Sequence, residues 1–316
     1  MARQGALNGK LVVLMGGSGF LGNYVAQALL ERGARLRIAS RQPEKAFTLK
    51  PLANLGQIQF ARCNAADRDS VERSLAGADA VVNLVGSFEG NLQRLMGEAP
   101  GWMAAEAARQ GAKSFVHVSA IAPEPDEDAP NAYADAKHLG ETRVREAFPA
   151  ATIVRPSIMF GKDDNFLNMF AGLIARLPML PVFGPEARLQ LVHVDDVAEA
   201  IATALESPGE HGGKTYELGG PEQLSMMEIN RAIADAQLRK RTFLPMPDVL
   251  SAGFAALPGT PMGSDQWNLL RQGNVVSGNH PGFAKLGIEP RPLDLFLERW
   301  MVRYRKHGRF DPRLSA

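Results

Sequence analysis

The sequence has little cysteine, little net charge and no obvious membrane-spanning run, and each shortage excludes a class of protein. Cys63 is the single cysteine in 316 residues, so no intramolecular disulfide can form, which fits a reducing compartment. A formal net charge of +1 gives no electrostatic reason to expect a nucleic-acid partner. Residues 11–30 carry no charge and are long enough to span a membrane, but their glycines and the change to helical spacing at Phe20 favour a strand, a turn and a helix. We therefore expect no transmembrane segment.

Short apolar, β-branched runs alternate with helical patterns in the first half of the chain. The predicted strands lack polar alternation, as expected where both faces of a parallel sheet are buried. The pattern therefore predicts an α/β fold of the Rossmann type, which is a doubly wound parallel sheet. The strands are expected at 10–15, 35–40, 57–61, 78–85, 113–118 and 151–154, and the helices at 20–32, 70–76, 92–110 and 132–148.

The rhythm changes after residue 156, where proline and glycine become frequent. Helical patterns continue at 165–176, 196–206 and 226–236, with short strands near 189–192 and 215–218. We expect a Rossmann domain over 1–160 and a smaller α+β lobe over 161–316, partly interleaved with the first.

A glycine-rich turn joins the first predicted strand to the first predicted helix. Gly16 permits a tight turn, Gly19 leaves room for a pyrophosphate, and Gly22 lets the helix pack closely on the sheet. The helix start also offers unpaired N–H groups to phosphates. A merely structural turn is the alternative, but the strand, loop, helix and second strand stand at the spacing of a dinucleotide site. The predicted contacts are Gly16, Gly17, Ser18, Gly19, Phe20, Leu21 and Gly22.

The end of the second predicted strand selects the form of the dinucleotide. A site for NAD(H) usually has Asp or Glu there, accepting a hydrogen bond from the ribose 2′-hydroxyl. Here the strand ends in Ser40-Arg41, and no acid occurs before Glu44. A guanidinium at Arg41 suits a 2′-phosphate, although a solvated surface arginine is the alternative. The sequence thus favours NADP(H) over NAD(H).

Tyr133 and Lys137 stand four residues apart, on one face of a predicted helix. A neighbouring ammonium favours the phenolate, so we expect Lys137 to lower the pKa of Tyr133 toward a value useful for proton transfer. Taken alone, the pair is better explained as an ordinary surface pair.

These motifs occur in the order found in the extended short-chain dehydrogenases/reductases, of the NAD-dependent epimerase/dehydratase superfamily, which the first 220 residues or so resemble. The resemblance implies that Tyr133 transfers a proton, that Lys137 orients the ribose, and that a serine polarises the substrate oxygen. Ser119 is the candidate, but the expected position, two residues further on, holds Ile121, which cannot donate a side-chain hydrogen bond. The cofactor contacts that the resemblance adds are Asn64, Leu84, Val85, Gly86, Ser119, Tyr133, Lys137 and Pro156.

A narrower resemblance rests on the segments 81–86, 117–119, 137–141 and 154–168. They are similar to the nucleotide-binding accessory subunits of respiratory complex I and their bacterial relatives. This resemblance implies tight NADP(H) binding and a structural or assembly role linked to complex I. An active NADP(H)-dependent reductase or epimerase, acting through Tyr133 and Lys137 on a carbonyl or sugar-nucleotide substrate, is the alternative.

A basic amphipathic pattern at 293–307 predicts a helix that either docks on a membrane surface or a partner, or packs on the core with its charges solvated. The segment 249–264 is apolar and uncharged but is broken by two prolines. No metal site is expected. The predicted location is cytoplasmic, with peripheral contact to the inner membrane as a further expectation.

Overall fold

The structure is a computed structural model that describes residues 5–126, 130–255 and 264–306. The chain divides into two units and passes between them repeatedly. Unit 1 contains Met1–Pro156, Val194–Leu218 and Ser277–Glu289, and unit 2 contains Ser157–His193, Gly219–Val276 and Pro290–Ala316.

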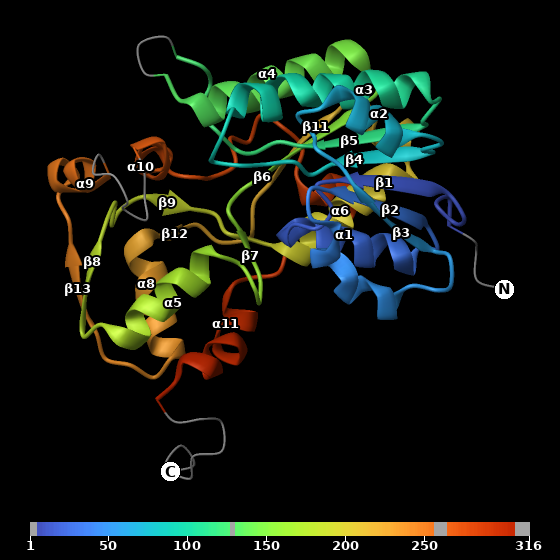
Figure 1. Ribbon diagram of the computed structural model, residues 1–316. Helices are drawn as coiled ribbons and strands as arrows, with labels where there is room; N and C mark the ends of the chain where they lie inside the picture. Colours follow the sequence, from blue (N-terminus) through green and yellow to red (C-terminus); the bar gives the residue numbers. More distant parts are fainter. Residues whose placement is uncertain (1–4, 127–129, 256–263, 307–316) are drawn as a thin grey trace. The chain divides into compact units, whose positions relative to one another are not determined.

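Unit 1 is built on a seven-stranded parallel sheet with the order β11-β6-β5-β4-β1-β2-β3 (Figure 1). β1 lies between β2 and β4, so the strand order reverses there, and open α/β sheets bind ligands at such a switch point. The Rossmann-type prediction is confirmed. The strands are β1 (Leu11–Met15), β2 (Arg35–Ser40), β3 (Ile58–Arg62), β4 (Ala80–Asn83), β5 (Ser114–Val118), β6 (Thr152–Pro156) and β11 (Thr215–Leu218).

One predicted strand belongs to a different part of the fold than expected. The run at 215–218 was predicted for the smaller lobe, but it forms β11, pairs with β6 and extends the main sheet. All four of its residues are buried there.

Helices cover both faces of the unit 1 sheet. α1 (Phe20–Glu31) and α6 (Val194–Glu206) pack together on one face, and α2 (Arg68–Leu75), α3 (Ala99–Arg109) and α4 (Ala132–Ala147) lie on the other (Figure 1). The remaining helical segments of this unit are η1 (Pro43–Leu52), η2 (Gln93–Glu98), α7 (Pro208–His211) and η3 (Phe283–Leu286).

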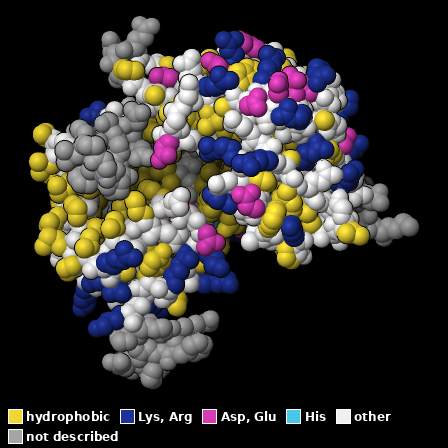
Figure 2. Space-filling model, viewed as in Figure 1, with side chains coloured by type: hydrophobic (Ala, Val, Ile, Leu, Met, Phe, Trp, Pro, Cys, Tyr) yellow, Lys and Arg dark blue, Asp and Glu magenta, His cyan; other side chains and the backbone are white. Residues whose placement is uncertain are grey.

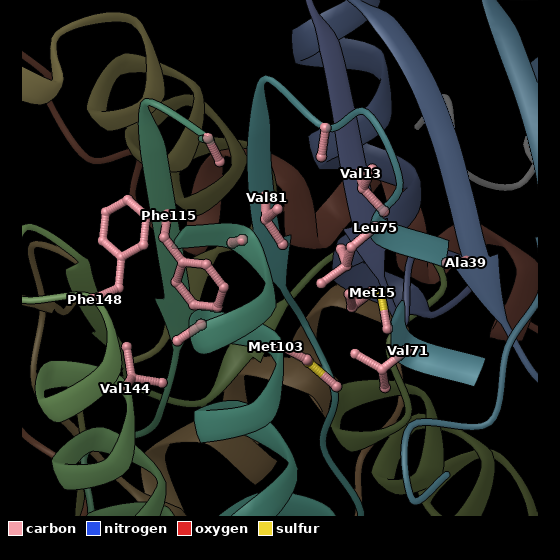
Figure 3. Close-up of a cluster of buried hydrophobic side chains, with 14 of the residues drawn as sticks. Val13, Met15, Ala39, Val71, Leu75, Val81, Met103, Phe115, Val144 and Phe148 are labelled. Atoms are coloured by element: carbon pink, nitrogen blue, oxygen red, sulfur yellow. The ribbon is translucent and has the colours of Figure 1, made fainter. Parts of the chain in front are cut away.

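Alternate residues of the central strands fill the core beneath α2, α3 and α4. Val13 and Met15 of β1 meet Val71 and Met103 of the helices in a continuous buried cluster (Figure 3). Each such side chain contributes about 1.5–3 kcal/mol on burial. This packing fixes the positions of the strands and therefore of their carboxyl ends.

Unit 2 is made of short paired strands and helices. β10 pairs with β7, β13 pairs with β8, and β12 pairs antiparallel with β9. Its strands are β7 (Met159–Phe160), β8 (Met179–Val182), β9 (Arg188–Leu189), β10 (Val192–His193), β12 (Leu224–Ser225) and β13 (Thr242–Pro245). Its helical segments are α5 (Phe166–Arg176), α8 (Met226–Ala236), α9 (Asp248–Ala255), α10 (Ser264–Gln272), α11 (Asp294–Met301) and η4 (Val302–Tyr304).

The basic helix predicted at 293–307 is shorter in the structure. It forms α11 and the single turn η4, and Leu297 and Met301 are buried in the core of unit 2. The helix therefore packs on its own core through these residues. Residue 307 lies outside the described residues, as does most of the apolar stretch that follows α9.

Several large apolar side chains of unit 2 face solvent around β8, β13 and α9, where Figure 2 shows a gathering of hydrophobic side chains. They are Leu177, Met179, Leu244, Val249 and Leu250. No helix in the described ranges is both long enough and apolar enough to cross a membrane.

Candidate functional site

The glycine-rich loop between β1 and α1 has the geometry of a phosphate cradle. Gly16 has φ +80°, and a Cβ added there would lie 3.2 Å from the backbone of Leu84. A Cβ at Gly22 would lie 2.5 Å from the Gly17 carbonyl oxygen, so the start of α1 approaches the loop as closely as backbone allows. Gly19 is exposed, and a Cβ added there would lie at an ordinary contact distance, 3.4 Å, from the Gly16 carbonyl oxygen. A diphosphate fits this arrangement because the loop leaves room at Gly19 and the helix start supplies N–H donors.

Hydroxyl groups link the loop to the end of β2. Ser18 donates a hydrogen bond to Ser40 over 2.8 Å, and Arg41 follows with an exposed side chain. Asn64, after β3, uses its side chain to accept from the Ala66 N–H and close a local turn.

The other predicted cofactor contacts lie at the carboxyl ends of neighbouring strands. Leu84 continues from β4 and donates its N–H to the carbonyl of Met15 in β1. A Cβ at Gly86 would lie 3.9 Å from the Lys137 Nζ. The structure thus brings the glycine loop, the segment after β4 and α4 together at one edge of the sheet.

Tyr133 and Lys137 share one face in the first turns of α4. The helix is capped by Asn131, whose side chain accepts from the Ala134 N–H. Lys137 is buried and donates to the carbonyl of Val118 over 3.2 Å. Loss of hydration on burial lowers the pKa of Lys137 to about 8.

Tyr133 has a higher pKa than we expected from the sequence. Burial raises it to about 12, because a phenolate would be poorly solvated there. The ammonium of Lys137 lies 5.9 Å from the Tyr133 ring centroid, and its hydrogen bond goes to Val118. The expectation that Lys137 lowers the pKa of Tyr133 is therefore wrong.

Phe88 stacks on Tyr133 from the loop that follows β4. The ring centroids are 4.4 Å apart and the planes differ by 17°. Sequence reasoning missed this contact, although an aromatic residue in the short polar segment 87–91, directly after a predicted strand end, was a usable signal.

Ser119 and Ile121 follow β5. Ser119 is buried, and its hydroxyl lies near enough to the Glu141 carboxylate to help lower the pKa of that group. The N–H of Ile121 donates to the carbonyl of Pro156 at the end of β6. Ile121 thus lies in the loop directly after β5 and offers no side-chain hydroxyl there.

A buried polar network supports the site from beneath. The Asn83 amide lies 3.0 Å from His117 Nδ1 and also accepts from the Val85 N–H, which fixes the start of the loop after β4. Burial, with Lys137 nearby, lowers the pKa of His117 to about 3, so this imidazole is neutral at ordinary pH. Polar residues inside otherwise apolar strands were the signal for this pair.

A second buried pair ties α4 to β6. Arg155 donates two hydrogen bonds of 2.8 Å to the Glu141 carboxylate, and Glu217 of β11 lies 3.8 Å away from Arg155. Burial alone would raise the pKa of Glu141, but the hydrogen bonds from Arg155 outweigh it, and the pKa lies below its usual value. Within the described residues, no group of three or more His, Cys, Asp or Glu side chains could hold a metal ion.

Comparison with known proteins agrees with this geometry. The family model described as "NAD dependent epimerase/dehydratase family" matches residues 12–219. A similar curated protein is subunit 9 of the NADH dehydrogenase [ubiquinone] 1 alpha subcomplex, mitochondrial, of Arabidopsis thaliana, which is 30% identical over 98% of this chain and 82% of that protein. The ceramide reductase of Caulobacter vibrioides is 27% identical over 79% of this chain and 80% of its own length.

Among solved structures, the triphenylmethane reductase of a Citrobacter species matches with a TM-score of 0.73 and 20% identity, covering 92% of this chain and 99% of that one. That likeness shows the fold. The resemblance noted in the sequence is thereby confirmed: the chain belongs to the NAD dependent epimerase/dehydratase family and is homologous over nearly its whole length to this subunit of the mitochondrial NADH dehydrogenase.

Proposed function

We propose that this protein binds a nicotinamide dinucleotide, NADP(H) in preference to NAD(H), and acts as a binding and assembly protein linked to respiratory complex I. The cradle formed by Gly16, Gly19 and Gly22 supports dinucleotide binding, and so does the family's description as NAD dependent. The bound group would supply hydride chemistry; the chain's own residues hold its phosphates, ribose and nicotinamide.

The end of β2 supports the preference for NADP(H). Ser40 is joined to Ser18, Arg41 is exposed beside it, and β2 ends without the acid that a ribose 2′-hydroxyl would require. A guanidinium matches a phosphate in charge and geometry.

One observation carries the proposal of a structural rather than catalytic role: the Tyr133 ring stacks on Phe88, and the pKa of its phenol is raised to about 12. Such a phenol gives up its proton reluctantly, and efficient proton transfer needs a pKa near the working pH. Ile121 adds to this, because it offers no hydroxyl to polarise a substrate carbonyl.

The test is the identity and behaviour of the nucleotide in purified full-length protein. We expect NADPH to remain bound through gel filtration, to exchange slowly with labelled NADPH, and to resist oxidation by ketones, quinones and nucleotide sugars. Rapid exchange together with turnover of any of these compounds would overturn the structural role.

An active NADP(H)-dependent reductase or epimerase is the second candidate. It is favoured by the intact Tyr133 and Lys137 pair on α4 and by the similarity to a ceramide reductase. It predicts turnover that Tyr133→Phe abolishes while dinucleotide binding survives. Activity that persists in this variant would exclude the assigned role of Tyr133.

The exposed apolar residues of unit 2 support a partner surface, because soluble monomers rarely leave such groups clustered in water. Val249 is 82% exposed and Leu250 is 57% exposed. We expect the double variant Val249→Asp, Leu250→Asp to reduce co-migration with complex I on native gels of membrane extracts. Leu55→Asp on unit 1, where the side chain is fully exposed, is the matched control and should migrate as the wild type. If the double variant co-migrates with complex I as fully as the Leu55→Asp control, this surface is excluded as the partner surface. The proposed peripheral location at the cytoplasmic side of the inner membrane then loses its support.

A further inference from the structure

The neighbouring strand β3 ends beside Ser40 in a second arginine. The register of β2 and β3 pairs Ser40 with Arg62, so these residues are direct neighbours at the carboxyl edge of the sheet. Neighbouring strands are about 4.8 Å apart, well within the reach of an arginine side chain.

Two contacts and the strand register determine which face of the sheet Arg62 occupies. Ile38 lies 3.3 Å from the Cβ position of Gly17, and Ser40 accepts from Ser18, so both face the glycine loop. Side chains alternate along a strand, and paired residues share a face. Ile38 pairs with Phe60 and Ser40 pairs with Arg62, so Arg62 lies on the side of the glycine loop.

Packing around Phe60 agrees with this placement. Its ring lies 4.9 Å from that of Phe47 in η1, the segment that follows β2. Arg37 and Gln59 are paired in the register and lie on the opposite face. There Arg37 donates hydrogen bonds to the Gln59 side-chain oxygen and to the carbonyl of Ser74.

Arg41 and Arg62 differ from Arg37 in their partners. Both are exposed, and in the part of the chain that the structure describes neither makes a side-chain hydrogen bond or an ion pair. These two guanidinium groups have no carboxylate partner, and the hydroxyls of Ser18 and Ser40 are near them in the chain or across the sheet. This combination of groups suits a phosphate monoester.

We propose that Arg62 is a second specificity-determining residue, which binds the ribose 2′-phosphate of NADP(H) together with Arg41, Ser18 and Ser40. This inference rests on the proposed dinucleotide binding. It adds a cation from a different strand, so that the phosphate is held from two sides and discrimination against NAD(H) does not depend on Arg41 alone.

The test is calorimetric titration of the full-length protein, freed of bound nucleotide, with NADPH and with NADH. Arg62→Gln is expected to weaken NADPH binding about tenfold, the effect of losing one charge-assisted contact, and to leave NADH binding unchanged. Arg62→Lys keeps the positive charge but lacks the two parallel N–H donors of a guanidinium, and it should weaken NADPH binding by less than Arg62→Gln does. The matched control is Arg35→Gln, which removes an exposed arginine at the opposite end of β2, about 16 Å away; it should change neither affinity.

The outcomes separate this inference from the proposed function. If wild type prefers NADPH and Arg62→Gln keeps the full preference, only the role of Arg62 is excluded. An equal loss for both nucleotides also excludes it, because Arg62 would then act through the fold, which a lowered melting temperature would show. If the wild type binds neither nucleotide, the proposed function fails, and the role of Arg62 fails with it.

Discussion

The aromatic ring of Phe88 stacks on that of Tyr133 at a centroid distance of 4.4 Å. Phe88 itself is 53% exposed, whereas Tyr133 is partly buried, so the stacked ring of Phe88 covers one face of the Tyr133 ring. The contact links a short loop after β4 to the residue on which any proton transfer in this protein would depend.

Phe88→Ala should open the Tyr133 phenol to water and to reagents. Because burial raises its pKa to about 12, renewed hydration should bring the pKa back toward its ordinary value near 10. The measurement is the rate of Tyr133 acetylation by N-acetylimidazole near neutral pH, followed by peptide mass spectrometry. We expect a severalfold faster rate than in the wild type.

Phe88→Tyr is the control, because it keeps an aromatic ring for stacking and should react as slowly as the wild type. Tyr24, on α1, serves as an internal reference in the same digest. Equal acetylation rates in the alanine variant and the wild type would show that Phe88 does not shield the phenol.

Two glycines of the loop should respond differently to alanine. A Cβ at Gly22 meets the carbonyl oxygen of Gly17 at 2.5 Å, so the backbone must move, and we expect Gly22→Ala to lower the free energy of unfolding by about 1–3 kcal/mol. Gly19 has φ −79° and its Cβ would be 3.4 Å from the Gly16 oxygen, so Gly19→Ala should fold normally.

The same Gly19→Ala variant should lose dinucleotide binding at least tenfold, since its methyl group fills the space that we assign to the pyrophosphate. Urea unfolding and calorimetric titration measure the two properties separately. If Gly19→Ala binds NADPH as tightly as the wild type, the pyrophosphate does not bind next to Gly19.

The binding of NADH should weaken as the pH rises above about 8. Burial lowers the pKa of Lys137 to about 8, so its ammonium is present below that pH and is lost above it in the free protein. Binding an anionic dinucleotide favours the charged form, and the affinity should therefore be constant well below pH 8 and fall through it. NADH is the probe because it lacks the titrating 2′-phosphate. In Lys137→Met the slope should vanish, and a slope that persists there would assign the titration to another group.

Breaking the buried pair of Arg155 and Glu141 should be costly. Arg155→Met leaves a buried carboxylate without its partner, and we expect the free energy of unfolding to fall by about 3–5 kcal/mol near pH 7. The folded pKa of Glu141 lies below its usual value, so its contribution is present above the unfolded pKa and is lost as the pH falls through the folded pKa. The difference in the free energy of unfolding between Arg155→Met and the wild type should therefore become smaller at acidic pH.

Arg143→Met is the control for this pair, because Arg143 and Glu146 form an exposed ion pair on the same helix. Such pairs contribute about 0–1 kcal/mol. If urea titrations show the same decrease in the free energy of unfolding for both arginine variants, the buried pair of Arg155 contributes no more to stability than the exposed pair of Arg143.

Local patterns were sufficient to predict much of unit 1. The glycine loop follows from backbone requirements at Gly16 and Gly22. In unit 2, the helix at 226–236 was predicted with the bounds of α8 because its apolar spacing is regular. The common face of Tyr133 and Lys137 follows from helical geometry alone.

Contacts between distant segments were beyond such patterns. That Lys137 donates to the carbonyl of Val118 depends on how closely α4 approaches β5, and the stacking of Phe88 depends on the path of a loop. The strand at 215–218 shows the same limit, because its residues indicate a buried strand without indicating which sheet it joins. The roles assigned to Tyr133, Lys137 and Ser119 remain predictions.

The interleaving of the two units has a consequence for how the chain acquires its structure during synthesis. Unit 1 needs β11, which is made after the first segment of unit 2, and η3, which is made after the second, while unit 2 needs α11, which comes later still. Unit 1 therefore has all of its segments only after residue 289 and unit 2 only at the end of the sequence, and neither can be cut out as one continuous fragment. A gene encoding half of this protein would yield an open sheet edge rather than a domain.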